Sequence, residues 1–354
     1  MPRRFVLVRS VPIFVLALPA ALALLAAACS TPEDETPIGE PVSPAPIPKG
    51  WMLSSGHVFG QGLFATRLPG GRARQMGLST DTVVFDARWD EPGETAYAFV
   101  QHGSDQTEVQ LVRVGTSGDA TPIGEPHQNV SSTSAAAGTY LVATCFHGDG
   151  DTRVVDDGED AWRHVADGCT ATLSPDGASA AFSEDGHTIS TVPTDGGEPT
   201  DLVDLDDVQG LTAAGLRDAR VEEMAWGDPG LAMVLHRGER FGLLIHTEDG
   251  DRVSAIPGLP AFVGGLKWQP NGSLVAVVTF FQGQGSLLRA MDAGTGRVKV
   301  LATDPRGLGG TVWAPDGSLL AALGSRGAWV FVDEDGHRAT EVPVDNEIPF
   351  DWGT

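Results

Sequence analysis

Basic residues, cysteine and tyrosine are scarce in this chain of 354 residues. It has 23 Lys and Arg, only three of them Lys, against 47 Asp and Glu, so its formal net charge is −24. Nucleic-acid binding and electrostatic docking on anionic lipid both need clustered cations, and the composition argues against both. We therefore expect no nucleic-acid partner.

Gly and Pro, in contrast, are abundant, with 45 and 24 residues. This composition is typical of a chain that consists of many short strands and turns rather than helices. The hydrophobic share of 41% and the charged share of 20% exclude a membrane bundle and a plainly disordered chain. The length allows one large domain or two ordinary ones.

The N-terminus has the features of an export signal. Arg3, Arg4 and Arg9 form a positive start, and residues 11–28 follow without a charge and end in small residues. This order is typical of a secretory signal, which we assign to residues 1–28. The alternative is a transmembrane anchor, but the apolar stretch is at the lower length limit for a span and no positive flank follows it.

The end of this segment, Leu25-Ala-Ala-Ala-Cys29, resembles a bacterial lipobox, although the usual pattern places Leu one residue closer to the Cys. The resemblance implies that the Cys29 thiol is acylated after cleavage and anchors the chain in the membrane. Cleavage after Ala28 by an ordinary signal peptidase is the alternative. Residues 29–50 are rich in Pro and acids, so we expect an extended tether. Without the signal, the net charge would be about −27.

Two further cysteines, Cys145 and Cys169, lie 24 positions apart. In an oxidising compartment outside the cytoplasm they could form a disulfide. The alternative is two buried free thiols that act as small apolar residues. The sequence leaves both interpretations open.

A repeated unit extends over residues 51–354, with a mean spacing of about 44 residues, the length of a propeller blade. In its turn, Pro fixes φ, Asp can bond its own backbone and Gly accepts positive φ. The clearest copies are Leu173-Ser-Pro-Asp-Gly177, Trp268-Gln-Pro-Asn-Gly272 and Trp313-Ala-Pro-Asp-Gly317, with variants at Trp89 and Trp226, a degenerate copy at 136–139 and a truncated copy at Phe350-Asp-Trp352.

A second turn follows the first in every unit, for example at Asp195-Gly-Gly197, Asp249-Gly250 and Asp335-Gly336. Two turns and strands of alternating character give four strands per unit. We predict an all-β, seven-bladed propeller over residues 51–354, with six blades as the alternative if the weak unit at 130–165 is not a true blade. The C-terminal strand and the first N-terminal strands would complete one blade together, which removes an open sheet edge.

The pattern Trp-x-Pro-Asp-Gly-x-x-x-Ala, with the later Asp-Gly-Gly, resembles the propeller of TolB-type periplasmic proteins and covers nearly all of residues 51–354. The resemblance implies the fold. It does not imply that this chain has the function of TolB, because the chain lacks the small α/β domain that precedes the TolB propeller. The chain also lacks the Gly-His and Trp-Asp pair of the eukaryotic WD-type blade.

No catalytic signature is present in the sequence. It contains no Gly-x-Ser-x-Gly elbow, no His-Glu-x-x-His and no Cys/His spacing of a zinc site, and we expect no cofactor. The Pro-Asp-Gly carboxylates and the recurrent Trp occur once per blade, so we interpret them as architecture.

Candidates for a metal or substrate site occur where the chain turns after the second strands, on one face of the predicted propeller. They are His102, His147, His187 and His236, together with Glu184 and Asp185. The alternative is that these residues are ordinary polar loop tips.

Residues 201–221 lengthen one unit on the same face. Leu205, Val208 and Leu211 have partial helical spacing and predict a short helix that could act as a recognition element. The alternative is a plain crossover whose apolar residues pack on the rim.

Three functional hypotheses follow. The first is a binding or scaffold propeller, a monomer, anchored by lipid on the outer side of the cytoplasmic membrane, that recognises an envelope protein, an extracellular protein or a small ligand. The second is a hydrolase or lyase acting on a sugar or lactone in the central funnel, where catalytic groups from different blades need no linear motif. The third is a purely structural envelope protein. We favour the first.

Overall fold

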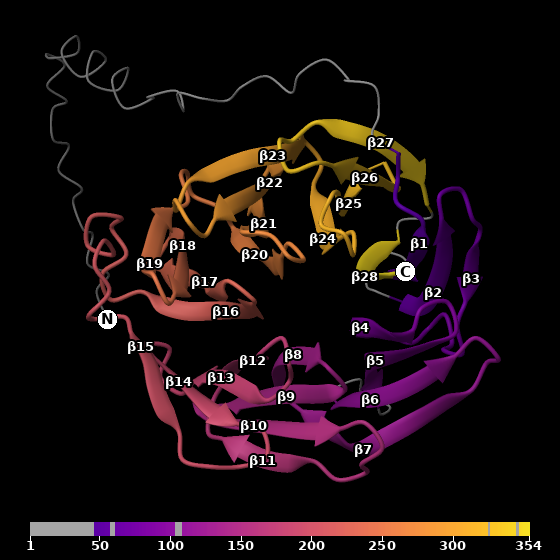
Figure 1. Cartoon of the computed structure of the whole chain (residues 1–354), viewed down its shortest axis with the longest axis horizontal. Helices are drawn as coiled ribbons and strands as arrows, with labels where there is room; N and C mark the ends of the chain where they lie inside the picture. The colour runs from indigo at the N-terminus through magenta and orange to yellow at the C-terminus, as the bar shows by residue number, and fades with distance from the viewer. Residues whose placement is uncertain (1–45, 57–60, 103–107, 325, 345–346) are drawn as a thin grey trace, which may run out of the picture. The chain divides into compact units, whose positions relative to one another are not determined.

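The chain folds into seven four-stranded antiparallel sheets around a central axis in the computed structural model (Figure 1). The structure describes residues 46–56, 61–102, 108–324, 326–344 and 347–354. These ranges contain no helix, and therefore none that could span a membrane. The predicted seven-bladed propeller is confirmed. The six-bladed alternative is wrong, because the weak unit forms a full blade of its own.

The blades are numbered in chain order, starting with the one that the two chain ends share. Blade 1 consists of β28 (Ile348–Gly353), β1 (Gly50–Gly56), β2 (Gln61–Leu68) and β3 (Ala73–Gln75). Blade 2 consists of β4 (Val84–Glu91), β5 (Thr95–His102), β6 (Glu108–Gly115) and β7 (Ala120–Gln128). Blade 3 consists of β8 (Val130–Ala136), β9 (Thr139–Phe146), β10 (Asp149–Asp156) and β11 (Arg163–Ala166).

Blades 4 to 7 follow the same order from the innermost to the outermost strand. Blade 4 consists of β12 (Thr170–Leu173), β13 (Ser179–Ser183), β14 (Thr188–Pro193) and β15 (Thr200–Asp204), and blade 5 of β16 (Arg220–Gly227), β17 (Gly230–Arg237), β18 (Arg240–Thr247) and β19 (Gly250–Ala255). Blade 6 consists of β20 (Phe262–Trp268), β21 (Leu274–Phe281), β22 (Gly285–Asp292) and β23 (Val298–Asp304). Blade 7 consists of β24 (Leu308–Trp313), β25 (Leu320–Gly324), β26 (Ala328–Val332) and β27 (Arg338–Pro343).

Both ends of the propeller contribute to blade 1. The C-terminal β28 pairs with the N-terminal β1, with Trp352 opposite Met52. This pairing closes the ring as predicted and leaves no first strand without a neighbour. Upstream of β1, Ile47 packs on the core that blades 1 and 7 share.

Because strands alternate in direction, the connections fall on two faces. The Pro-Asp-Gly face carries the turns between first and second strands and between third and fourth strands. The crossover face carries the turns between second and third strands and the crossovers that join successive blades. The first strand of each blade lies innermost, and first strands of neighbouring blades lie side by side (Figure 1).

The Pro-Asp-Gly turn of blade 4 has the predicted geometry. The Asp176 carboxylate accepts hydrogen bonds from the Ser174 hydroxyl at 2.6 Å and the Ala178 amide at 3.0 Å. Gly177 has a φ of 71°, and a Cβ there would lie 2.7 Å from the carbonyl oxygen of Ala136 in blade 3. The carboxylate therefore stabilises the turn, and the glycine allows neighbouring blades to approach closely.

The recurrent Trp residues join neighbouring blades. The indole Nε1 of Trp268 donates to the carbonyl oxygen of Ala225 at 2.9 Å, and that of Trp313 donates to Lys267 at 3.0 Å. Both acceptors lie on the first strand of the preceding blade. The Trp89 indole also donates to the preceding blade, but its acceptor, the Trp51 carbonyl oxygen, lies on β1, the second strand of blade 1. These contacts agree with the architectural interpretation of the Trp residues.

Blade 3 lacks the Pro-Asp-Gly motif because its first turn has a different geometry. Ala137 and Gly138 both have positive φ, 47° and 82°. Two consecutive positive φ values are typical of the two-residue turn that matches the twist of a hairpin. The blade is therefore complete although its sequence signature is weak.

Candidate functional site

Large hydrophobic side chains that remain exposed gather on the crossover face. Among the described residues they are Phe85, Phe146, Leu259, Phe262 and Phe280, with exposed fractions from 37% to 66%. Each lies at the start of a first strand, at the end of a second strand or in a crossover, and all these positions belong to that face. Exposed apolar clusters of this kind mark interaction sites.

Three of these residues form one patch on blade 6, which we call the blade 6 patch: Leu259, Phe262 and Phe280. Phe262 and Phe280 are paired neighbours on β20 and β21. A Cβ at Gly264 would lie 2.5 Å from the Phe262 ring, so the ring lies directly on the backbone there. Strand pairing therefore fixes the positions of Phe262 and Phe280 in the patch, as a preformed binding surface requires.

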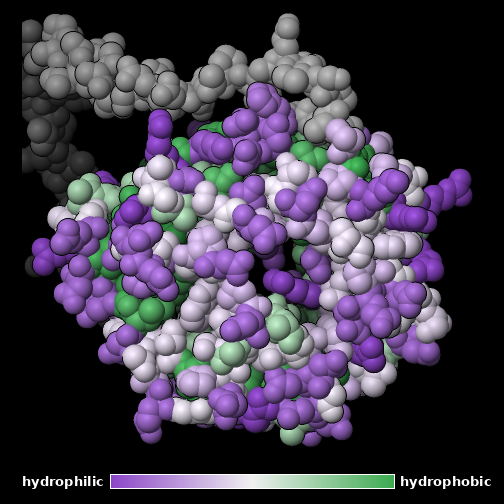
Figure 2. Space-filling view, in the orientation of Figure 1, coloured by the Kyte–Doolittle hydropathy of each residue, from purple (hydrophilic) through white to green (hydrophobic). Residues whose placement is uncertain are grey.

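The ring is hollowed at its centre, and hydrophilic residues border the opening on the face that Figure 2 shows. Polar side chains of first strands bond backbone amides of the next blade. Ser132 Oγ accepts from the Ala171 amide at 3.1 Å, and Asp351 Oδ2 accepts from the Trp89 amide at 2.9 Å. These polar groups therefore hold the ring together.

Glu223 on β16 makes two such bonds. Its Oε2 accepts from the Gly265 amide at 2.8 Å and its Oε1 from the Leu266 amide at 2.9 Å. Burial raises the pKa of Glu223, although these hydrogen bonds and the nearby Lys267 oppose the shift. A carboxyl group with a raised pKa is suited to general acid–base work, but here both oxygens clamp blade 6 to blade 5.

The histidine candidates lie on the crossover face, as predicted, but in different blades. His102 is the last residue of β5, and His236 lies near the end of β17. His147 lies in the turn after β9. His187 lies in the turn after β13, together with Glu184 and Asp185. His147 contacts the Phe146 ring, and His236 Nδ1 lies 3.0 Å from Glu222 Oε1. No three His, Cys, Asp or Glu side chains come together as a possible metal site within the described ranges.

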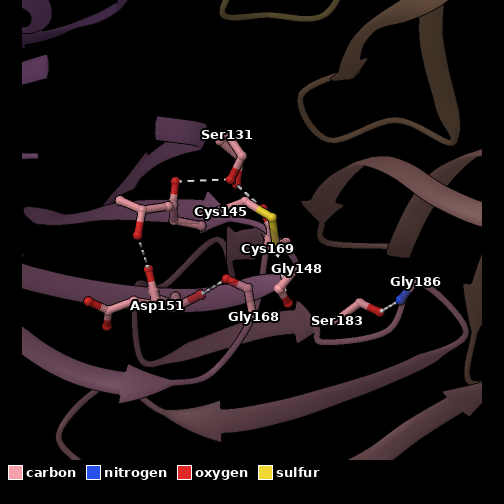
Figure 3. Close-up of a disulfide and its surroundings, with 12 residues drawn as sticks. Ser131, Cys145, Gly148, Asp151, Gly168, Cys169, Ser183 and Gly186 are labelled. Atoms are coloured by element: carbon pink, nitrogen blue, oxygen red, sulfur yellow. Dashed lines mark hydrogen bonds between the residues drawn. A yellow bond between two sulfur atoms is a disulfide. The ribbon is translucent and has the colours of Figure 1, made fainter. Parts of the chain in front are cut away.

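Cys145 and Cys169 form a disulfide, with an S–S distance of 2.12 Å and a Cα–Cα distance of 4.9 Å (Figure 3). Cys145 is near the end of β9, and Cys169 directly precedes β12. The bond therefore links blade 3 to the start of blade 4 at the crossover face. The Cys169 amide also donates to the Ser183 carbonyl oxygen at 3.1 Å, which fixes the strand start.

Residues 205–219 cross from β15 to β16 through successive turns, so the predicted helix is wrong. Leu205, Val208, Leu211 and Leu216 are buried in one core cluster with side chains of blades 4 and 5. The spacing that suggested a helix arises because each turn directs one apolar residue inward. The insertion is therefore the plain crossover of the alternative interpretation, and its exposed residues are mostly polar.

Two cavities adjoin the propeller's faces. One, of about 150 Å³, lies between blades 6 and 7, and Asp304, Arg306, Arg326 and Glu341 are among its lining residues. It is smaller than the roughly 300–1,000 Å³ of pockets that enclose drug-sized ligands. The other, a shallow hollow, lies on the Pro-Asp-Gly face, where residues 46–48 meet blade 7.

The blade 6 patch and the Glu223 clamp were not predicted from the sequence. Phe262 and Phe280 belong to strands whose other apolar residues are buried or half-buried, so no pattern distinguishes them before the register is known. One signal was present: the crossover Pro257-Gly-Leu-Pro260 places an apolar Leu259 in a turn, where polar residues are the rule.

No protein-family model and no curated protein matches the sequence. Solved structures that resemble the chain include TolB of Acinetobacter baumannii (12% identity, TM-score 0.48), apo AztD of Citrobacter koseri (10%, 0.52) and the periplasmic gluconolactonase PpgL of Pseudomonas aeruginosa (13%, 0.54). The match to TolB covers 86% of this chain and 66% of that chain. The matches to AztD and to PpgL each cover 87% of this chain and 99% of the other chain. The chain thus spans just under two thirds of TolB. At these identities, the likeness shows the fold alone.

Proposed function

We propose that this chain is an exported, lipid-anchored propeller that binds an envelope or extracellular protein through its crossover face. The observation that carries the proposal is that all the exposed large hydrophobic side chains among the described residues lie on that face. Protein interfaces concentrate their binding energy in aromatic anchors of this kind.

Export and anchoring rest on the N-terminal sequence, because residues 1–28, Cys29 and most of the 29–50 tether lie outside the described residues. Two structural features support them. The disulfide is suited to an oxidising compartment. Residues 46–48 lie on the Pro-Asp-Gly face, so the chain joins the propeller opposite the proposed binding face.

The test is co-purification from the producing cell in mild detergent. The chain with Phe262→Ser and Phe280→Ser is compared with the unaltered chain and with Asp335→Ser, a matched change of an exposed residue on the opposite face. We expect a protein partner to co-purify with the unaltered and Asp335→Ser chains and to be lost from the double variant. Equal recovery with all three chains would contradict the proposal.

The anchor is tested separately with Cys29→Ser. We expect the unaltered chain to remain in the detergent phase and to carry a lipid mass on its N-terminal peptide, and the variant to lose both properties. A mature N-terminus at another residue, without lipid, would instead support ordinary secretion.

A second candidate function is hydrolysis of a sugar or lactone at the central opening. It is supported by the gluconolactonase among the similar structures and by the raised pKa of Glu223 beside that opening. Release of acid from glucono-lactone by the purified chain, lost in Glu223→Gln, would favour this function. A rate equal to the uncatalysed one would leave the binding proposal as the better account.

A further inference from the structure

We propose that the segment recognised at the crossover face is an acidic protein segment with apolar side chains, bound along an arc over blades 5 to 7. This inference rests on the proposed function and specifies the chemistry of its partner. The arc comprises the turn after β17, the crossover to β20, the turn after β21, the crossover to β24 and the turn after β25. The blade 6 patch lies at its middle.

The charge on this arc has the opposite sign to that of the chain. Its loops carry Arg237, Arg240, Arg306 and Arg326 against Glu239 and Asp304, whereas the whole chain has a net charge of −24. On the opposite face, the turns of the same three blades are strongly acidic. They carry Asp228, Glu248, Asp249, Asp292, Asp316, Asp333, Glu334 and Asp335, with Arg297 and Arg338 as cations.

Three arginines of the arc have no ion-pair partner within the described residues: Arg240, Arg306 and Arg326, all of them exposed. Arg237 has only a long pair, 3.8 Å from Asp218. Exposed arginines without an ion pair in the described ranges also occur on the opposite face, for example Arg72 and Arg297, but those of the arc lie on the face that carries the blade 6 patch. They are suited to an anionic ligand, which a guanidinium can bind through two parallel hydrogen bonds.

The cavity between blades 6 and 7 places two of these arginines beside the patch. Arg306 and Arg326 line it together with Asp304 and Glu341, and its volume of about 150 Å³ could accommodate a carboxylate side chain. Asp304, in the same cavity, accepts a hydrogen bond from the Arg306 backbone amide at 2.9 Å. Gly307 follows Arg306 and lies against the Phe280 ring. A partner can thus place an acidic group in the cavity and an apolar group on the patch within a few residues.

An anionic membrane could offer similar chemistry, but the observations favour a protein. The net charge of −24 repels an anionic bilayer as a whole, and a few arginines between acids do not form the polybasic cluster that such lipids need. A short acidic segment, in contrast, meets only the local charge of the arc, because screening confines electrostatic interaction to about 8–10 Å at physiological salt.

The experiment selects displayed random 12-residue peptides for binding to the mature propeller and measures their affinity by fluorescence anisotropy. We expect selected peptides rich in Asp, Glu, Leu and Phe. Their Kd should rise about tenfold with Arg306→Ala or with Arg326→Ala, and further with Phe262→Ser; one tenfold step corresponds to 1.4 kcal/mol. The matched control Arg297→Ala should leave Kd unchanged, and raising the salt to 0.5 M should weaken binding.

The possible outcomes separate this inference from the proposed function. If the selected peptides are neutral or basic but bind more weakly to the Phe262→Ser variant, the inference of an acidic partner is wrong, while the proposal that the crossover face is the binding face is retained. Peptides that no crossover-face variant affects would overturn both. Binding of phosphatidylglycerol vesicles that depends on the same arginines would assign the arc to a membrane and overturn the protein segment.

Discussion

The two faces of this propeller are made of the same blades but follow different rules. The Pro-Asp-Gly face repeats one solution: a carboxylate that bonds its own turn and a glycine that lets blades approach. The crossover face repeats nothing. It carries an insertion, a disulfide and exposed aromatic side chains.

This difference separates architecture from function in a repeat protein. A residue type that recurs at the same turn in several blades, such as Asp176 and Asp316, is explained by the turn itself. A residue that departs from the repeat and remains exposed, such as Phe262, has no structural explanation of that kind. In a chain without catalytic motifs, departures from the repeat are therefore the place to look for function.

The largest expected effect concerns the disulfide on the crossover face. Replacing Cys145 and Cys169 together by Ser should lower the free energy of unfolding by about 3 kcal/mol, because the bond restricts a loop of this length in the unfolded chain. Urea unfolding of both chains measures the loss. The same loss should follow reduction of the unaltered chain; no difference between reduced and oxidised chains would contradict the prediction.

On the Pro-Asp-Gly face, Gly177→Ala should cost about 2–3 kcal/mol. An alanine at this position is strained by the positive φ, and its Cβ would also lie 2.7 Å from the Ala136 carbonyl oxygen of blade 3. Gly158→Ala is the matched control, because it has a φ of 81° but nothing within 4 Å, and it should cost only about 1 kcal/mol. Equal urea midpoints for the two variants would show that blade contact does not matter at this turn.

A smaller effect is expected for the indole bonds between blades. Trp268→Phe removes the hydrogen bond to Ala225 and leaves that carbonyl without its partner, which should cost about 1 kcal/mol. The buried indole nitrogen of Trp162 has no hydrogen-bond partner in the described part of the chain, so Trp162→Phe is the control and should be nearly neutral. A larger loss at Trp162 than at Trp268 in thermal unfolding would refute the role given to these bonds.

The smallest effect on stability concerns Glu223 at the central opening. Its raised pKa means that the folded protein binds more protons than the unfolded chain between about pH 4.3 and the folded pKa. The contribution to stability is therefore greatest at low pH and is lost as the pH rises through the folded pKa. Glu223→Gln should reduce the fall in unfolding free energy between pH 4 and pH 7.

Urea unfolding at several pH values measures that slope. Glu239→Gln, which alters an exposed carboxyl group in the turn after β17, serves as the control and should keep the slope of the unaltered chain. Identical slopes for Glu223→Gln and the unaltered chain would mean that Glu223 does not titrate differently on folding.

The fold was predictable because its determinants are local and repeated. Pro-Asp-Gly turns and Trp anchors such as Trp313 fix the blade length, and the partial units at the two ends predict the shared blade. The crossover face was less predictable. The apolar spacing of Leu205, Val208 and Leu211 mimics a helix, and Phe262 is distinguished from buried neighbours only by its register. The cysteine pair was one of two open interpretations, because spacing alone does not fix the distance between two strands.

The central claim, that the crossover face is the binding face, is tested most directly by photo-crosslinking in the producing cell. A photoreactive residue replaces Phe262 on the crossover face or Arg297 on the Pro-Asp-Gly face; both positions are exposed and both belong to blade 6. We predict a discrete higher-mass adduct from position 262 and none from position 297. An adduct from position 297 alone, or the same adduct from both positions, would contradict the account.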